Sequence, residues 1–499
     1  MRILRMLLFV LVMCAIAANT ADFEDGTSIC DKCTCLVANS TTTVLSYDLL
    51  DCSRSNLLHM FDNWPKQFET SNPQREIVVS LSGNEMTQLQ PLPPTSASLV
   101  FSCRHCKLEN LASGLFLDTP NVLRADLSWN KLDGYVLSSD VFRGQYHEEE
   151  NYASLSLDVL DLGYNVITQL TDDVFKYVTS LRRLSLAYNA LGKISESTAT
   201  ALKQLIHLEY LDLSYSSLTH IDSEIFIEMH ALQELLIQGN KLTVIPDAVF
   251  HTTSLVSLNL GENPIDTLNM NKPLHKLHHL NMSSMPALNR IHVDSFQNVK
   301  SLRSLTCRNN TALEVFDLAI LGHAINLQQL DLSQSSLKHL SPPNRRVNDS
   351  LIQNSLELQS NLNSLEILEL ADNPWHCDCD LQLVLTHVGL KLDTEKNSRC
   401  ETPNMLISLH LSELTHIDVC DLVVNETPKN SIYEKPAFLR PRAIFLTLLS
   451  IGIVVGVGIV IGLIIVCLKR RLTDNGIGFT SPVRYTSVRE STPSAVYQL

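Results

Sequence analysis

The sequence predicts an α/β solenoid: a horseshoe of stacked repeats with a parallel β-sheet along its concave face. The first observation is the pattern Leu-x-x-Leu-x-Leu-x-x-Asn-x-Leu, which recurs at spacings of about 24 residues. The second is a group of four cysteines on each side of the repeats. The third is an uncharged apolar run of 26 residues near the C-terminus, which predicts one transmembrane helix in addition to the solenoid.

The repeats carry the prediction of the fold. Three clear copies are Leu181, Leu184, Leu186, Asn189, Leu191; Leu232, Leu235, Ile237, Asn240, Leu242; and Leu255, Leu258, Leu260, Asn263, Ile265. This is the leucine-rich repeat signature. Such a repeat buries its leucines only against its neighbours, so the repeats have to stack. The Asn position, used as a ruler, gives about twelve repeats between residues 75 and 375: Asn84, Cys106, Asn130, Asn165, Asn189, Ser216, Asn240, Asn263, Met285, Asn310, Ser335 and Asn373.

Each repeat is expected to contribute a short parallel strand that ends near the Asn position. The Asn side chain turns inward there and hydrogen-bonds turn backbone that would otherwise be buried without a partner. Ser216 and Ser335 can do this more weakly and Met285 cannot, so we expect a local irregularity at Met285. Two long repeats, at 144–151 and 341–364, predict surface loops. Phenylalanines fill the outer side, where helical or irregular turns should run: Phe142, Phe175, Phe226, Phe250 and Phe296.

The clustered cysteines predict two caps. The N-terminal cap, residues 28–60, contains Cys30, Cys33, Cys35 and Cys52, and the C-terminal cap, residues 376–422, contains Cys377, Cys379, Cys400 and Cys420. A solenoid has two open ends whose leucines would meet water, and small caps with little core of their own are typically stapled by disulfides. A zinc site is disfavoured because the cysteines are expected in an oxidising compartment outside the cell, and because they lie at the two ends of the repeats. We therefore expect no metal and no cofactor.

Three further cysteines lie within the repeats. Cys103 and Cys106 occupy positions six and nine, which both point into the core, and two alternatives stay open: buried thiols or a strained local disulfide. Cys307 occupies position six of its repeat, where other repeats carry leucine. A small buried thiol is preferred there over an intermolecular disulfide.

The two ends of the chain predict a single-pass type I protein of the plasma membrane. Residues 1–21 have the basic start and short apolar run of a signal peptide. Residues 443–468 are long enough to cross a bilayer, and Lys469, Arg470 and Arg471 follow as a cytoplasmic flank. A GPI anchor is disfavoured because a polar segment follows this run. We expect an extracellular N-terminus, a stalk at 423–442 and a cytoplasmic tail at 469–499.

Charge and motif content argue against two classes of function. Outside residues 1–21 and 469–499 the chain has 31 basic and 51 acidic residues, a net charge of about −20. A polyanion such as nucleic acid needs a basic face, so a nucleic-acid ligand is disfavoured. The sequence contains no Gly-rich phosphate loop, no Gly-x-Ser-x-Gly and no His-Glu-x-x-His, and we expect the protein not to be an enzyme.

The candidate ligand-binding residues are four aromatics at position eight of consecutive repeats: Trp129, Tyr164, Tyr188 and Tyr215. Aromatic side chains are favoured anchors at interfaces. The alternative is that the rings only pack along the sheet edge. Five sequons predict glycans: Asn39, Asn281, Asn309, Asn348 and Asn425. Glycans at Asn281 and Asn309 would crowd the C-terminal half of the concave face, so a protein ligand is expected in the N-terminal half.

The transmembrane and tail segments carry weaker motifs. Gly452 and Gly456, and Gly458 and Gly462, form two small-xxx-small pairs that permit close helix contact and a homodimer. In the tail, the segment from Tyr485 to Val488 fits an endocytic signal. The last residues, from Tyr497 to Leu499, fit the C-terminal strand that a PDZ domain binds. The alternative is an unstructured tail that only stops transfer.

The repeats and their flanking cysteine groups resemble the single-pass leucine-rich repeat cell-surface proteins common in insects. The ectodomain is similar to that of Toll-type receptors, but the tail has no room for a TIR domain. The resemblance implies that Cys377 pairs with Cys400 and Cys379 with Cys420. It also implies a recognition receptor or adhesion protein with an extracellular protein ligand or cell-surface partner. The alternative is an innate-immune or signalling co-receptor that acts through a partner's cytoplasmic domain.

Overall fold

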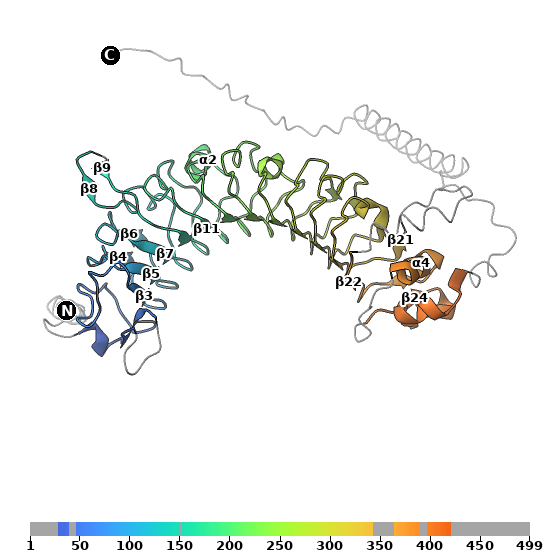
Figure 1. Cartoon of the computed structure of the whole chain (residues 1–499), viewed down its shortest axis with the longest axis horizontal. Coiled ribbons are helices and arrows are strands. Elements are labelled where there is room, and N and C mark those ends of the chain that lie inside the picture. Colours follow the sequence, from blue (N-terminus) through green and yellow to red (C-terminus); the bar gives the residue numbers. More distant parts are fainter. Residues whose placement is uncertain (1–27, 39–45, 150, 343–363, 389–396, 421–499) are drawn as a thin grey trace, which may run out of the picture. The chain divides into compact units, whose positions relative to one another are not determined.

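The computed structural model describes residues 28–38, 46–149, 151–342, 364–388 and 397–420. Stacked repeats form a curved solenoid in which the strands line the inner side of the curve (Figure 1). One fourteen-stranded sheet runs through it in the order β1-β2-β3-β5-β7-β10-β11-β12-β13-β14-β16-β18-β20-β22. Only β1 is antiparallel to its neighbour within this sheet. The predicted parallel-strand solenoid is confirmed.

Twelve strands of this sheet come from the repeats, in agreement with the count from the Asn positions. They are β3 (Glu76–Ser80), β5 (Ser98–Ser102), β7 (Val122–Asp126), β10 (Val159–Asp161), β11 (Arg183–Ser185), β12 (Tyr210–Asp212), β13 (Glu234–Leu236), β14 (Ser257–Asn259), β16 (His279–Asn281), β18 (Ser304–Thr306), β20 (Gln329–Asp331) and β22 (Ile367–Glu369). The central leucine of each three-residue strand is buried and its two neighbours are more exposed. This alternation follows from the two-residue period of a strand.

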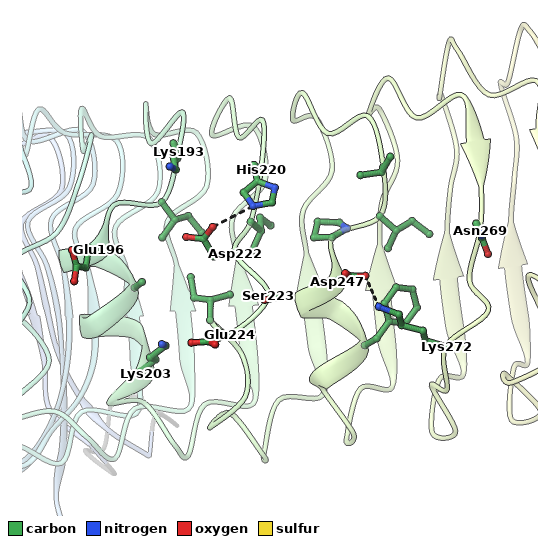
Figure 2. A pocket seen from close by; sticks show the side chains of 18 of the residues that line it. Lys193, Glu196, Lys203, His220, Asp222, Ser223, Glu224, Asp247, Asn269 and Lys272 are labelled. Carbon is green, nitrogen blue, oxygen red and sulfur yellow. Dashed lines mark hydrogen bonds and ion pairs between the residues drawn. The ribbon is translucent and has the colours of Figure 1, made fainter.

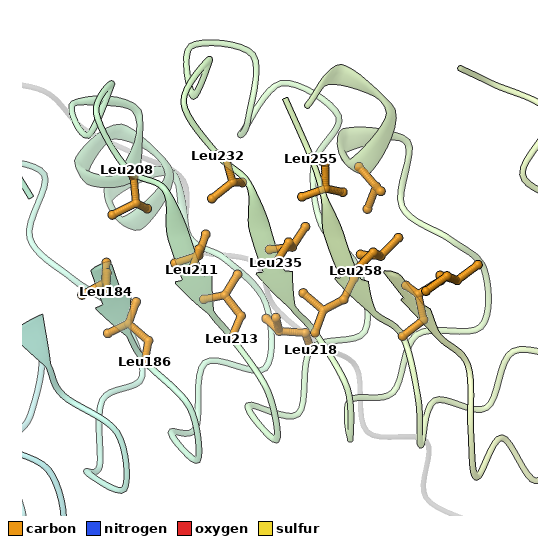
Figure 3. Close-up of a cluster of buried hydrophobic side chains, with 14 of the residues drawn as sticks. Leu184, Leu186, Leu208, Leu211, Leu213, Leu218, Leu232, Leu235, Leu255 and Leu258 are labelled. Carbon is orange, nitrogen blue, oxygen red and sulfur yellow. The ribbon is translucent and has the colours of Figure 1, made fainter. Parts of the chain in front are cut away.

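The leucines of successive repeats meet in register inside the solenoid. Leu184 pairs with Leu211, Leu211 with Leu235, and Leu235 with Leu258 along the sheet (Figure 3). All four are buried, at 1% exposure or less. Burying one leucine side chain stabilises a fold by about 1.5–3 kcal/mol. A repeat therefore gains most of its stability from its two neighbours.

The Asn at position nine satisfies the backbone where each strand ends, as predicted. Asn240 accepts hydrogen bonds from the N–H groups of Ser216 and Leu218, at 3.0 and 2.9 Å. Its amide donates to the carbonyls of Leu213 and Ile237, at 3.0 and 2.9 Å. Ser216 supplies only hydroxyl donation, to Leu186 and Ser214. Met285 is buried without such contacts of its own side chain, and its N–H donates to Asn310.

Short and irregular elements form the outer side. The helices there are α2 (Glu196–Lys203), η2 (Asp247–His251) and η3 (Leu318–Leu321). Small parallel pairs join β4 (Gln88–Leu89) with β6 (Asn110–Leu111), β15 (Thr267–Leu268) with β17 (Arg290–Ile291), and β19 (Val315–Asp317) with β21 (His339–Ser341). The first long repeat forms a hairpin of β8 (Tyr146–His147) and β9 (Asn151–Tyr152). Most of the second, 343–363, lies outside the described residues. The predicted outer phenylalanines are buried, Phe250 only partly.

Disulfides staple the segments that flank the repeats. The N-terminal segment holds η1 (Ile29–Asp31), β1 (Thr34–Leu36) and β2 (Asp48–Asp51), with bridges Cys30–Cys35 and Cys33–Cys52. The C-terminal segment holds β23 (Trp375–His376), α4 (Cys379–Val388), β24 (Cys400–Thr402), η4 (Asn404–Leu406) and η5 (Leu411–His416). Its bridges are Cys377–Cys400 and Cys379–Cys420, the pairs that the resemblance implied.

The three cysteines within the repeats form one disulfide and leave one free thiol. Cys103 and Cys106 form a disulfide, so of the two alternatives for this pair the structure has the bridged one. Cys307 is a free thiol and fully buried.

Within the described part of the chain, no helix is long and apolar enough to cross a membrane. The predicted signal peptide, stalk, transmembrane helix and tail (1–21, 423–442, 443–468 and 469–499) lie outside that part.

Candidate ligand-binding face

Position eight is a left-handed turn in all twelve repeats. Its backbone φ lies between 51° and 77°. The residues are Gly83, His105, Trp129, Tyr164, Tyr188, Tyr215, Gly239, Glu262, Ser284, Asn309, Gln334 and Asp372. This conformation costs a residue that carries a Cβ about 1–2 kcal/mol. It turns the chain out of the strand so that the next residue can point inward. The side chains at position eight therefore line the edge at which the strands end.

Five rings at this edge form a continuous stack, which we call the aromatic ladder: His105, Trp129, Tyr164, Tyr188 and Tyr215. The three central steps have ring centroids 3.7, 4.0 and 4.3 Å apart and interplanar angles of 10°, 11° and 15°. His105 lies 4.7 Å from the Trp129 centroid at 34°. Neighbouring strands are about 4.8 Å apart, only a little more than the 3.7–4.3 Å between the centroids of the stacked rings. Aromatic residues at one repeat position can therefore stack with little adjustment.

The ladder ends where the next repeat has a glycine. A Cβ on Gly239 would lie 2.2 Å from the Tyr215 ring, so this ring covers the glycine. Beyond it, the Tyr215 hydroxyl donates a 2.7 Å hydrogen bond to the carboxylate of Glu262, two repeats away. Burial, and next this hydrogen bond, raise the pKa of Tyr215. A hydrogen bond with Tyr188 raises the pKa of Tyr164. The phenol groups thus form one polar line along the ladder.

A hollow of about 440 Å³ lies against the ladder on the concave face. Small residues at position seven leave this space: Ser128, Gly163, Ala187 and Ser214. The carboxylates of Asp161 and Asp212, at position five, line the same hollow. Each accepts a hydrogen bond from the backbone N–H two residues on, at 2.8 and 2.9 Å. This bond uses one carboxylate oxygen and fixes the side chain.

Asp161 is the least compensated of these carboxylates. It accepts hydrogen bonds from Gly163 and Ser185, but it makes no ion pair with any residue that the structure describes. Burial raises the pKa of the Asp161 carboxyl above its usual value, and the nearby charge of Asp126 adds to this, while the Gly163 hydrogen bond and the charge of Arg104 oppose it only in part. Asp126 itself has Arg104 at 3.6 Å. An uncompensated carboxylate in a hollow favours a positively charged occupant.

A larger cavity, of about 1130 Å³, opens on the outer side between α2 and η2 (Figure 2). The intervening repeat, residues 222–229, has turns in place of a helix there. Two pairs of these lining residues are in contact: His220 with Asp222 at 3.2 Å and Lys272 with Asp247 at 2.6 Å. Nothing in the sequence pattern predicted it. Within the described residues, no cluster of three His, Cys, Asp or Glu side chains could hold a metal ion.

Two of the five sequons lie in the described part of the chain. Asn281 is in β16, on the exposed side of the strand, and its oxygen accepts the Ser283 N–H at 3.0 Å. Asn309 is at position eight, and its amide donates to Ser284 at 2.9 Å. Both are in the C-terminal half of the repeats, away from the ladder. Asn39, Asn348, Asn425, the glycine pairs and the tail motifs lie outside the described residues.

The structure brings the four predicted aromatics together and adds residues that the sequence interpretation missed. His105 and Glu262 extend the ladder at its two ends, and both occupy position eight. The Asn ruler places them in the same row, so this signal was present in the sequence. Asp161 and Asp212 share position five with leucine and serine residues of other repeats. Their importance depends on the small neighbours that open the hollow, which a repeat-by-repeat comparison does not reveal.

Comparison with known proteins finds similar repeats in part of the chain. A family model described as leucine rich repeat matches residues 155–208, 192–242 and 231–286. Tsukushi from Gallus gallus is 24% identical over 306 residues, which cover 56% of this chain and 76% of Tsukushi. Osteomodulin from Bos taurus is 25% identical over 179 residues, which cover 32% of this chain and only 39% of osteomodulin.

A solved structure of the Toll–Spatzle complex from Drosophila is similar at 18% identity, with a TM-score of 0.44. The match covers 68% of this chain and 51% of that chain, and at this identity the likeness concerns the fold alone. The repeats are thus recognisable in the sequence of residues 155–286 and continue in the structure from β3 to β22. We conclude that this part of the chain is a leucine-rich repeat solenoid.

Proposed function

We propose that this chain is a cell-surface recognition receptor or adhesion protein that binds a protein ligand. The binding surface is the N-terminal half of the concave face, at the aromatic ladder and the adjoining hollow. The observation that carries the proposal is the ladder itself. Trp129 and Tyr188 are each 39% exposed although they stack on both sides against other rings.

The stacking makes the ladder a suitable anchor for a protein. Tyrosine and tryptophan are enriched among the residues that dominate interface energies. Rings that are already held by their neighbours lose little conformational entropy when a ligand binds. Because the ring faces cover one another, the ladder offers ring edges and hydroxyl groups. A protein surface with mixed apolar and polar groups fits these edges and hydroxyl groups. A flat ring ligand fits them less well, because it would need a free ring face for stacking.

The membrane attachment is part of the same proposal. A signal peptide at 1–21 and a transmembrane helix at 443–468 would place the solenoid outside the cell, with residues 469–499 in the cytoplasm. Glycans on Asn281 and Asn309 would cover the C-terminal half of the concave face and leave the ladder accessible.

The test is a binding screen followed by variants. The protein, displayed on cells, is screened against an array of extracellular domains, and affinity is then measured for each hit. The double variant Tyr164→Ala with Tyr188→Ala removes two adjacent rings. We expect it to weaken binding by about 30-fold or more, since an interface anchor contributes about 2 kcal/mol or more.

Two controls accompany this variant. Tyr188→Phe keeps the stack and removes one hydroxyl, so it should retain folding and most of the affinity. Asn281→Gln removes one glycan in the other half and should leave affinity nearly unchanged. If the double variant binds normally while Asn281→Gln abolishes binding, the site is in the C-terminal half and the rings only pack along the edge.

A signalling co-receptor that acts through a partner's cytoplasmic domain is the second candidate. The tail motifs at Tyr485 to Val488 and Tyr497 to Leu499 would then recruit endocytic adaptors or a PDZ protein. A homodimer through Gly452, Gly456, Gly458 and Gly462 fits either candidate. A pull-down with the tail separates them: adhesion predicts scaffold proteins, and a co-receptor predicts a partner with its own signalling domain.

A further inference from the structure

Two carboxylates, those of Asp161 and Asp212, line the hollow beside the aromatic ladder. Asp126, Asp161 and Asp212 stand at position five of three repeats in or next to it. Each carboxylate accepts one N–H from the backbone of its own turn. These bonds orient the carboxylates but supply no positive charge. The other oxygens remain for side chains or for a ligand.

The three carboxylates differ in what their other oxygen meets. Asp126 Oδ2 has the guanidinium of Arg104 at 3.6 Å. Asp212 Oδ2 accepts the Tyr210 hydroxyl at 3.3 Å. Asp161, between them, has the Ser185 hydroxyl as its neighbouring side-chain donor and no ion pair within the described chain. It is therefore the point in the hollow where a cation gains most.

The arginines that line the hollow are already engaged. Arg104 is directed to Asp126. The guanidinium of Arg183 lies 3.9 Å from the centre of the Tyr210 ring, in a cation–π contact. Neither makes an ion pair with Asp161. The hollow thus combines two arginines that are directed to other groups with one carboxylate, Asp161, that makes no ion pair within the described chain.

An independent observation comes from the other end of the same hollow. The side-chain oxygen of Gln238, which lines it, is buried and has no hydrogen-bond donor in the described chain. A buried acceptor without a donor costs about 1–3 kcal/mol. A ligand that brings N–H groups would remove this cost. The net charge of about −20 outside the predicted signal and tail would also attract a basic ligand from a distance.

We propose that the hollow receives a basic side chain, an arginine or a lysine, of the protein partner, with Asp161 as its counter-ion and the aromatic ladder as its wall. This inference rests on the proposed function, because it assigns the chemistry of the partner at the same surface. The head group of the basic side chain pairs with Asp161, and its alkyl stem packs along the ring edges of the ladder. Asp161 positions and selects the ligand; the ladder supplies contact area.

The test uses short peptides as probes on the full-length protein in lipid nanodiscs. Four fluorescein-labelled peptides, Gly-Gly-X-Gly-Gly with X as arginine, lysine, citrulline or glutamate, are titrated up to about 10 mM by fluorescence polarisation, a range suited to the weak affinity of one side chain. Citrulline has the shape of arginine without its charge. We expect saturable binding of the arginine and lysine peptides and at least tenfold weaker binding of the citrulline and glutamate peptides.

A matched pair of variants locates the site. Asp161→Asn keeps the acceptor for the Gly163 N–H and removes the charge. Asp331→Asn does the same at position five of a repeat beyond the ladder, where Asp331 accepts the Ser333 N–H at 3.0 Å. Asp161→Asn should weaken the arginine peptide at least tenfold, and Asp331→Asn should stay within twofold of the unchanged protein.

Four results would overturn the proposal: no saturable binding of the arginine peptide, equal binding of the citrulline peptide, tighter binding of the glutamate peptide, or equal effects of the two variants. Partner binding separates this proposal from the proposed function. If Asp161→Asn leaves a screened partner unaffected while the Tyr164→Ala, Tyr188→Ala double variant abolishes its binding, the ladder is the binding surface but the basic side chain is not. If the double variant binds the screened partner normally, the partner does not bind at the ladder and the proposed binding surface is wrong.

Discussion

Single residues in this solenoid are held by very different environments although their repeat positions are equivalent. Cys307 and Leu186 both stand at position six and are both fully buried, but Cys307 places a titratable thiol in the core, away from water. Asp161 and Asp331 both stand at position five and both accept a backbone N–H. Only Asp161 faces the hollow at the ladder. Chemistry at the residue scale therefore depends on neighbours in adjacent repeats.

Cys307 should be unreactive in the folded protein. Burial raises the pKa of its thiol to about 12, so almost none is present as the reactive thiolate at neutral pH. Iodoacetamide should label Cys307 after denaturation and not before, as read by mass spectrometry. A disulfide-linked dimer on a non-reducing gel that disappears in Cys307→Ser would contradict this, because it would require an accessible thiol.

Asp161 should make stability depend on pH in a defined direction. Its pKa is raised in the folded state, chiefly by burial. The folded state then holds the proton more tightly than the unfolded chain, and stability from this group is lost as pH rises through the folded pKa. Asp161→Asn should therefore raise the melting temperature more at pH 7 than at pH 3. A larger gain at pH 3 would show that the carboxylate is stabilised in the fold.

At the scale of elements, the edge at which the strands end determines how the ladder is built and where it stops. All five ring residues stand three positions after the end of a repeat strand and share the left-handed backbone of position eight. Gly239 has the same backbone but no side chain, so Tyr215 lies over it and reaches Glu262. One small residue in the row thus defines the C-terminal end of the aromatic ladder.

A pair of glycine variants tests this ending. Gly239→Ala adds a Cβ 2.2 Å from the Tyr215 ring at a φ of +65°, whereas Gly192→Ala adds one at +59° with no atom within 4 Å. Both should lose about 1–2 kcal/mol of unfolding free energy for the left-handed backbone. Gly239→Ala should lose more unfolding free energy than Gly192→Ala, because its new methyl group has to displace the Tyr215 ring. Urea denaturation measures both losses. Equal losses would mean that the ring moves aside freely.

At the scale of the whole described solenoid, each repeat touches mainly its two neighbours, so the ends are the weak points. At the C-terminal end, Trp375 is fully buried and its indole N–H donates to the Leu370 carbonyl at 2.8 Å. The bridges Cys377–Cys400 and Cys379–Cys420 hold the following segment over it. This segment covers the last leucines, which would otherwise face water.

Loss of one of these bridges should destabilise the whole solenoid. Cys379→Ser removes the bridge to Cys420, which closes a separation of 41 residues. Removing a native disulfide from a small secreted domain typically costs about 2–5 kcal/mol. We expect reduced surface expression by flow cytometry. Cys307→Ser, which removes a thiol but no bridge, is the matched control. Normal surface levels of Cys379→Ser would mean that the cap is held by packing alone.

Much of the fold could be predicted because it repeats. The Asn ruler located twelve turns, and each predicted turn follows a strand of the sheet, including those marked by Cys106, Ser216 and Met285. The periodic leucines predicted which side chains are buried. Alternate side chains of a strand point to opposite faces of the sheet, so the leucines all point into the core. The candidate binding site was predicted less well. Its aromatic row was found by position, but the hollow and its carboxylates were not.

The sequence by itself determined the class of fold, the strand positions, the flanking cysteine groups and the alignment of Trp129, Tyr164, Tyr188 and Tyr215. These depend on local periodicity and on covalent neighbours. Only the tertiary structure decided that these rings stack into one ladder, that Cys103 bridges Cys106, and that Asp161 makes no ion pair within the described chain. The ladder and the surroundings of Asp161 depend on the lateral spacing of strands and on side chains from neighbouring repeats, so no single repeat contains that information. The Cys103–Cys106 bridge lies within one repeat, but it depends on the backbone positions of the two cysteines, whose Cα atoms are 5.7 Å apart.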